Sequence, residues 1–147
     1  AQVCGIYASS RVDEVPDNVF ALPSRINSTW GGSLADMVRC RRFIEIIEED
    51  GLAPHITAMG ERLVAGLRAI ARRTGAFTSP RGRGSLAAVT LDTPEARGKL
   101  LADLFERELV VLASGPTSVR FRLPLVIQAA EVDEVLNRVE AAVTAKG

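Results

Sequence analysis

Val119-Arg-Phe-Arg-Leu-Pro124 is the stretch that decides the fold of this 147-residue chain. Its residues alternate in polarity, as the residues of a half-buried β-strand do. The apolar side chains of the run point to one face, whereas Arg120 and Arg122 point to the other. The sequence therefore predicts a strand over 118–123 with one face for a core and one face that carries two guanidinium groups.

Other parts of the chain supply partners for this strand. Two further runs predict strands at 85–91 and 109–112, and a Ser-Gly-Pro-Thr turn at 114–117 leads into the strand over 118–123. Strands that alternate with helices in a chain of single-domain size are typical of the α+β class. We expect an α/β sandwich, with a small antiparallel-type sheet covered by helices on one face.

Apolar residues recur at helical spacing in four segments. The first helix begins near Leu34 and is stopped by Gly51, and the second is capped by Gly75. The third follows the N-cap residue Thr93, and the fourth lacks a good N-cap because alanines stand at 129–130. The apolar positions at helical spacing are Leu34, Met37, Val38, Cys40, Phe43, Ile44 and Ile47; Leu52, Ile56, Met59, Leu63, Leu67 and Ile70; and Val132, Val135, Leu136, Val139 and Val143. Those of the third helix, Leu100, Leu101, Leu104 and Phe105, are expected to face the core.

Composition excludes several classes of function. The chain is 47% hydrophobic and 24% charged, with 18 basic and 18 acidic residues, so it has no overall field that would attract nucleic acid or an anionic membrane. Cys4 and Cys40 form neither a metal-ligand spacing nor a disulfide framework. No run has the length of a membrane span and no signal peptide is visible. These features predict a cytoplasmic protein without a metal site.

Pro23-Ser-Arg-Ile-Asn-Ser-Thr-Trp-Gly-Gly32 is a candidate anion site. Asn27, Ser28 and Thr29 place small polar side chains just before the first helix, where free backbone N–H groups attract a phosphate. The glycine pair at 31–32 lets a ligand approach the backbone. The alternative is that Ser28 or Thr29 only caps the helix.

The two arginines of the 118–123 strand are the second candidate. They stand about 7 Å apart along one strand face, and a guanidinium group can bind a carboxylate through two parallel hydrogen bonds. The alternative is an edge strand whose arginines are only solvated.

Three other features carry weaker signals. Pro80-Arg-Gly-Arg-Gly84 could approach a phosphate, but a tight connection into the next strand is the better interpretation. His55, the single histidine, is expected at the surface without a catalytic role. The two lysines, Lys99 and Lys146, lie on a polar helix face and near the C-terminus, where neither is placed to become a reactive amine.

Taken in chain order, these segments resemble the C-terminal part of a class III pyridoxal-phosphate aminotransferase of fold type I. The motifs that carry the resemblance across the class are Asn27–Gly32, Arg81–Gly84 and Val119–Leu125. Three more are similar to the lysine-specific branch of the class: Gln2–Gly5, Asp17–Phe20 and Pro23–Arg25. The resemblance implies that 1–22 is a remnant of the large cofactor-binding domain, 23–50 the active-site loop and interdomain helix, and 51–147 the C-terminal small domain.

The resemblance also assigns roles to residues. Thr29, with Ser28, would contact the phosphate of a pyridoxal 5'-phosphate held by the neighbouring subunit of a homodimer. Asn27 would line the same site, and Arg120 would hold the α-carboxylate of the substrate. The implied reaction moves the ε-amino group of L-lysine to 2-oxoglutarate. The lysine that binds the cofactor would lie upstream, so this chain alone is expected to be inactive.

Two alternatives stay open at this point. Within the class, an ornithine, acetylornithine or 4-aminobutyrate aminotransferase would share most of these motifs. Outside enzymes, a small α/β module for dimerisation or for binding a carboxylate ligand would have the same helices and strands.

Overall fold

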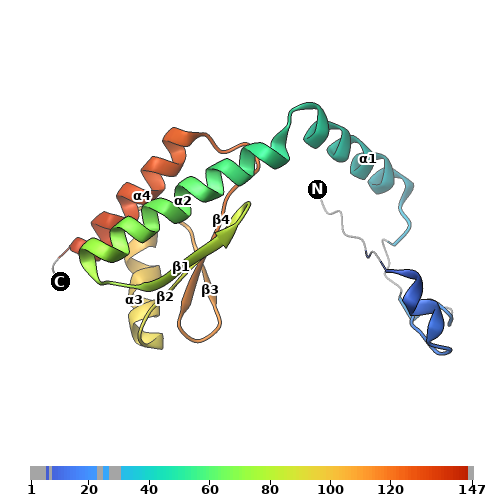
Figure 1. Ribbon diagram of the computed structural model, residues 1–147, viewed down its shortest axis with the longest axis horizontal. Helices are drawn as coiled ribbons and strands as arrows, with labels where there is room; N and C mark the ends of the chain where they lie inside the picture. The colour runs from blue at the N-terminus through green and yellow to red at the C-terminus, as the bar shows by residue number, and fades with distance from the viewer. Residues whose placement is uncertain (1–5, 7, 23–24, 27–30, 146–147) are drawn as a thin grey trace. The chain divides into compact units, whose positions relative to one another are not determined.

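The computed structural model describes residues 6, 8–22, 25–26 and 31–145. The chain divides into two compact units, Ala1–Asp50 and Gly51–Gly147, and each is described by itself (Figure 1).

The first unit contains a 3-10 helix, η1 (Ser10–Glu14), and one long helix, α1 (Leu34–Glu49). Helix α1 begins where the sequence predicts, and its N-cap is Ser33, whose side chain accepts a hydrogen bond from the Asp36 backbone N–H at 3.4 Å. None of its residues is buried. Most of its large apolar side chains are exposed, namely those of Leu34, Met37, Val38, Phe43 and Ile44, whereas Cys40, Ile46 and Ile47 are half-buried.

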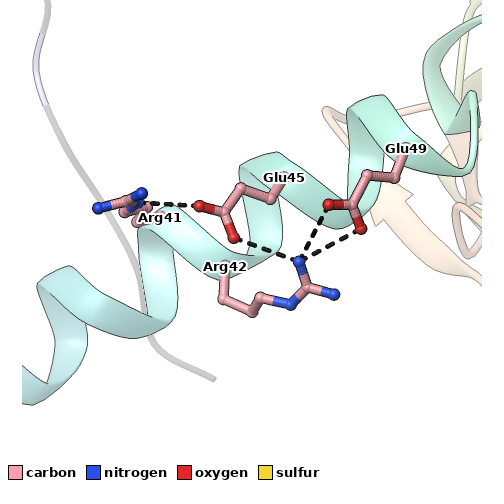
Figure 2. A network of polar contacts seen from close by, with 4 residues as sticks. All are labelled: Arg41, Arg42, Glu45 and Glu49. Atoms are coloured by element: carbon pink, nitrogen blue, oxygen red, sulfur yellow. Dashed lines mark hydrogen bonds and ion pairs between the residues drawn. The ribbon is translucent and has the colours of Figure 1, made fainter.

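A chain of ion pairs runs along the polar side of α1 (Figure 2). Arg41 Nε donates to Glu45 Oε1 at 2.8 Å, and Arg42 Nη1 donates to Glu45 Oε2 and to both carboxylate oxygens of Glu49, each at 3.2 Å. The hydrogen bond from Arg41, followed by that from Arg42, lowers the pKa of Glu45. These arginines therefore lie on the exposed face of the helix and pair with glutamates of the same helix.

The second unit is a four-stranded antiparallel sheet with three helices (Figure 1). Its strands lie in the order β1-β2-β4-β3, and this architecture confirms the predicted α+β fold with an antiparallel sheet. The elements are α2 (Leu52–Thr74), β1 (Thr78–Arg83), β2 (Leu86–Thr90), α3 (Pro94–Phe105), β3 (Leu112–Ser114), β4 (Ser118–Arg122) and α4 (Ala129–Thr144).

One hydrophobic core holds the sheet and helices of this unit together. The inward face of the two central strands is buried at Ala87, Val89, Val119 and Phe121. These side chains share a cluster with buried residues of all three helices, among them Leu63, Leu67, Leu100, Leu104, Val132 and Val139. Burying this face on one side leaves the opposite face of the sheet without helices.

Two glycines let α2 lie directly against the β1–β2 hairpin. A Cβ on Gly60 would stand 2.0 Å from the carbonyl oxygen of Gly84, and a Cβ on Gly82 would stand 2.9 Å from Val64 Cγ2. The glycines of the Arg-Gly-Arg-Gly motif therefore allow close helix–strand packing.

The prediction of a tight connection at 80–84 is wrong, because residues 80–83 belong to strand β1. Pro80 is tolerated there because β1 is an edge strand and pairs only with β2. Its register shifts between Thr78 and Arg81, and Ser79 adopts a positive φ of 49°. A bulged edge strand that contains proline and glycine gives little of the usual strand pattern in the sequence.

Two positions near the end of α3 also differ from expectation. The strand predicted at 109–112 lies at Leu112–Ser114, because the chain after α3 first folds back: the Leu109 N–H donates to the Leu104 carbonyl at 2.9 Å. Phe105 was expected in the core, but it is 67% exposed.

The start of α4 is better capped than its alanines suggest. The Glu131 carboxylate accepts a hydrogen bond from the Gln128 backbone N–H at 2.7 Å, and the helix begins at Ala129. The cap thus includes a glutamate inside the first turn that reaches back to the N-cap backbone, as in a capping box.

Candidate functional site

Arg120 lies near the middle of the sheet face that the helices leave open. It belongs to β4, which has β2 on one side and β3 on the other. Its partners across the sheet are Ala88 and Leu112, and its side chain is exposed between the buried Val119 and Phe121. The strict alternation is confirmed. The alternative is wrong in placing the arginines on an edge strand, because β4 is an interior strand, but their exposed side chains leave the carboxylate-binding role a prediction.

Among the paired strand positions, this open face carries four arginines and no acidic residue. Residues that are partners across antiparallel strands point to the same side of a sheet, so the register places Arg81 beside Ala88 and Arg83 beside Leu86 on the same side as Arg120 and Arg122. The other residues on this side are Thr78, Leu86, Ala88, Thr90, Leu112, Ser114 and Ser118. Among the described residues, none of the four arginines has an ion-pair partner.

A small hydrogen-bond network fixes one of these four guanidinium groups. Arg81 Nη1 donates to the Ser79 carbonyl at 3.0 Å and to Thr90 Oγ1 at 2.9 Å, and Arg81 Nη2 donates to Ser118 Oγ at 3.2 Å. The two hydroxyls also lie 3.2 Å from each other. Arg81 thereby reaches across β2 to β4, a role that the sequence did not reveal. The sequence does contain a signal for this network. Ser118 lies two residues before Arg120 and so on the same side of β4, and Thr90 is its partner on β2.

Two arginines on the helical side of the unit have carboxylate partners. Arg73 Nη2 lies 2.6 Å from Glu140 Oε1, and Arg138 Nε donates to Glu134 at 2.7 Å. Arg138 also borders an open hollow of about 400 Å³ beside α4, and its charge there is already paired. The four arginines of the open sheet face instead lie on β1 and β4, the two strands that flank β2, and several cations close together form a surface suited to an anionic ligand.

The cofactor-loop residues Asn27, Ser28 and Thr29 lie outside the described residues. Their alternative role can still be tested, because Ser33 occupies the N-cap position of α1. Neither Ser28 nor Thr29 is therefore the cap of this helix. Their proximity to Arg120 stays a prediction.

The structure confirms the predicted position of Lys99 and corrects that of His55. Lys99 is exposed on α3 and pairs with Asp103 at 2.6 Å, as its position on a polar face predicts. His55 was expected at the surface, but it is half-buried, and its Nε2 lies 2.8 Å from the Ile127 carbonyl oxygen. The imidazole therefore ties α2 to the segment before α4.

Metal-binding clusters and membrane spans are both missing from the described residues. No group of three or more His, Cys, Asp or Glu side chains is placed to hold a metal ion in that part of the chain. Likewise, none of its helices combines the length and the apolar character needed to cross a membrane.

Comparison with known families assigns the chain. Residues 6–143 match the family described as aminotransferase class-III. The chain belongs to the class III aminotransferases. The matched residues include the whole sheet and the arginines of β4.

Curated relatives sharpen the comparison. The chain is 48% identical over 142 residues to the L-lysine-epsilon aminotransferase of Mycobacterium tuberculosis, covering 96% of this chain and 32% of that protein. It is 41% identical over 148 residues to the enzyme of the same name from Amycolatopsis lactamdurans, covering 99% of this chain and 33% of that protein. The chain therefore spans about a third of the length of these relatives.

A solved structure gives the same result in three dimensions. The lysine aminotransferase of M. tuberculosis superposes with a TM-score of 0.83 at 48% identity, covering 97% of this chain and 33% of that one. Together with the antiparallel sheet, this match confirms the fold-type I assignment.

No lysine among the described residues is placed to bind pyridoxal phosphate covalently. Lys99, the lysine among them, is 68% exposed and held by a carboxylate, whereas a reactive amine needs a desolvated pocket. A cofactor would therefore depend on residues outside the described part of this class III chain.

Proposed function

We propose that this chain is the C-terminal part of a pyridoxal-phosphate aminotransferase that moves the ε-amino group of L-lysine to 2-oxoglutarate. Both substrates carry carboxylates, and the observation that carries the proposal is Arg120, whose exposed guanidinium on the open sheet face has no ion-pair partner among the described residues. The names of the two relatives support lysine as the amino donor. The cofactor would supply an electron sink for the bond cleavages at nitrogen-bearing carbons.

In this proposal Arg120 binds and orients a substrate carboxylate. The backbone of Arg120 is paired with β2 and β3, so the point from which its side chain leaves the sheet is already fixed when the ligand arrives. Its planar group can meet both oxygens of a carboxylate. Arg120 thereby fixes one end of the substrate while the reacting amino or keto group lies elsewhere.

The remaining parts of the site belong to the longer parent protein. Thr29 and Ser28 would bind the cofactor phosphate of the neighbouring subunit in a cytoplasmic homodimer, and Asn27 would line the substrate site. Residues 1–22 would belong to the large domain, 23–50 to the active-site loop and interdomain helix, and 51–147 to the small domain. The lysine that binds the cofactor would lie upstream, so the 147-residue chain supplied with cofactor and both substrates should form no glutamate.

A panel of amino donors tests the proposed specificity. The parent protein is assayed with L-lysine, ornithine, N-acetylornithine and 4-aminobutyrate, each with 2-oxoglutarate, and glutamate formation is measured. The proposal expects the highest kcat/KM with L-lysine. A higher value for another donor would assign the chain to that branch of the class, and turnover of none would favour a non-catalytic module.

A further inference from the structure

We propose that Arg81 and Arg120 together form a binding site for small α,ω-dicarboxylates, with one guanidinium group for each carboxylate. The site deepens the proposed function, because it would make Arg81 a residue that distinguishes a doubly charged substrate from a singly charged one.

The position of Arg81 is the first support. Its Nη2 lies 3.2 Å from Ser118 Oγ, although Arg81 itself belongs to β1, two strands away from β4. Ser118 and Arg120 point to the same side of β4 with Cα atoms about 7 Å apart. The guanidinium of Arg81 therefore lies close to the point where Arg120 leaves the sheet, within the reach of one small molecule.

The hydrogen bonds of Arg81 are the second support. Three of them hold the group, through Ser79, Thr90 and Ser118. A guanidinium has five N–H donors, so two stay available for a ligand. A cation that is fixed before binding loses little freedom when a carboxylate arrives, which favours recognition.

Charge is the third support. The paired strand positions of the open face carry four guanidinium groups and no carboxylate, and the helix-side carboxylates Asp133 and Glu140 are paired with Arg62 and Arg73. A dianion would neutralise both Arg81 and Arg120, whereas a monoanion would leave one of them uncompensated. The surface thus favours ligands with two carboxylates.

Glutarate and butyrate test this site on the 147-residue chain itself. Both have linear carbon skeletons and neither can be transaminated, but glutarate has a second carboxylate. Each is titrated into the ¹⁵N-labelled chain at low ionic strength, and the arginine Nε–H resonances and the dissociation constants are followed by NMR. The site predicts binding of glutarate about threefold tighter than that of butyrate, since one additional exposed ion pair contributes that much.

Variants separate a specific pair from a general charge effect. Arg81→Gln should remove the preference for glutarate, whereas Arg83→Gln removes the same charge from the same face and should keep it. Ser118→Ala leaves the charge of Arg81 but releases it from β4, so it should reduce the preference and also covers the case in which Arg81→Gln does not fold. Equal reduction by Arg81→Gln and Arg83→Gln, or equal binding of the two acids by the unmodified chain, would overturn the proposal.

The outcome is independent of catalysis. If the parent transfers no amino group but the chain still prefers glutarate through Arg81, the proposed function fails and the site stands. If the parent is an active transaminase and the chain shows no preference, the dicarboxylate site alone fails.

Discussion

Arg62 on α2 and Asp133 on α4 are joined by two parallel hydrogen bonds, from Nε to Oδ1 and from Nη2 to Oδ2, each 2.7 Å long. The hydrogen bond from Arg62 is the main reason that the pKa of Asp133 is lowered, and the pKa of Arg62 is raised in turn. The two residues are 71 positions apart in the sequence. Because their hydrogen bonds form only when α2 and α4 pack together, the pair can be used to test that packing.

The pair predicts a specific dependence of stability on pH. Because the folded-state pKa of Asp133 lies below its unfolded value of about 4, its contribution is complete above that value and is lost as the pH falls through the folded pKa. Asp133→Asn should therefore lower the Tm modestly at pH 7 and make no difference once the pH is below the folded pKa. Thermal unfolding at a series of pH values measures this, and an unchanged Tm difference at low pH would contradict it.

Gly60 provides a test of the close packing between α2 and the β1–β2 hairpin. An added Cβ would stand 2.0 Å from the Gly84 carbonyl oxygen, so backbone atoms must move. Gly60→Ala should reduce the free energy of unfolding by about 1–3 kcal/mol, the usual cost of overpacking. Urea denaturation measures the change.

Gly98 gives the matched control. It lies on α3, and an added Cβ meets nothing within 4 Å. Gly98→Ala should raise the free energy of unfolding by about 0.5–1 kcal/mol through helix propensity. Similar effects of the two substitutions would show that helix propensity, and not contact with the hairpin, governs the response at Gly60.

The sequence predicted those parts of the fold whose signal is local. Helix α1 begins at the expected Leu34 and α2 is capped by Gly75, as expected, because periodicity and a left-handed glycine mark helix ends in the chain itself. Strand β1 escaped notice because its pairing depends on β2 and on a bulge next to Pro80. A proline- and glycine-containing edge strand is recognised only from its partner.

The same distinction applies to the candidate site. The outward direction of Arg120 and Arg122 follows from alternation within one strand and was predictable. The contact between Arg81 and Ser118 depends on three strands in register, which sequence spacing does not reveal. The contact of His55 with the Ile127 carbonyl oxygen likewise joins residues 72 positions apart.

Arg120→Lys in the parent protein tests the carboxylate-binding role. A lysine keeps the charge but loses the two-pronged geometry, so KM for the carboxylate substrates should rise about tenfold, the value of one lost charge-assisted hydrogen bond. Steady-state kinetics with L-lysine and 2-oxoglutarate measure this. Arg68→Lys, on the exposed side of α2, is the control and should leave KM unchanged. Equal KM values in all three proteins would remove Arg120 from the site.

Thr29→Ala in the parent tests the proposed contact with the cofactor phosphate. Loss of one hydroxyl that donates to a charged phosphate should weaken cofactor binding about tenfold. The variant and the unmodified protein are dialysed against cofactor-free buffer, and the bound cofactor is measured by its absorbance. Equal retention would assign Thr29 another role.

Transfer of isotope from lysine is the most direct test of the central claim. The parent protein is incubated with L-lysine labelled with ¹⁵N at the ε-nitrogen and with unlabelled 2-oxoglutarate, and the glutamate formed is analysed by mass spectrometry. The account predicts glutamate that carries the ¹⁵N label. Unlabelled glutamate formed from the α-amino group, or no glutamate at all, would contradict it.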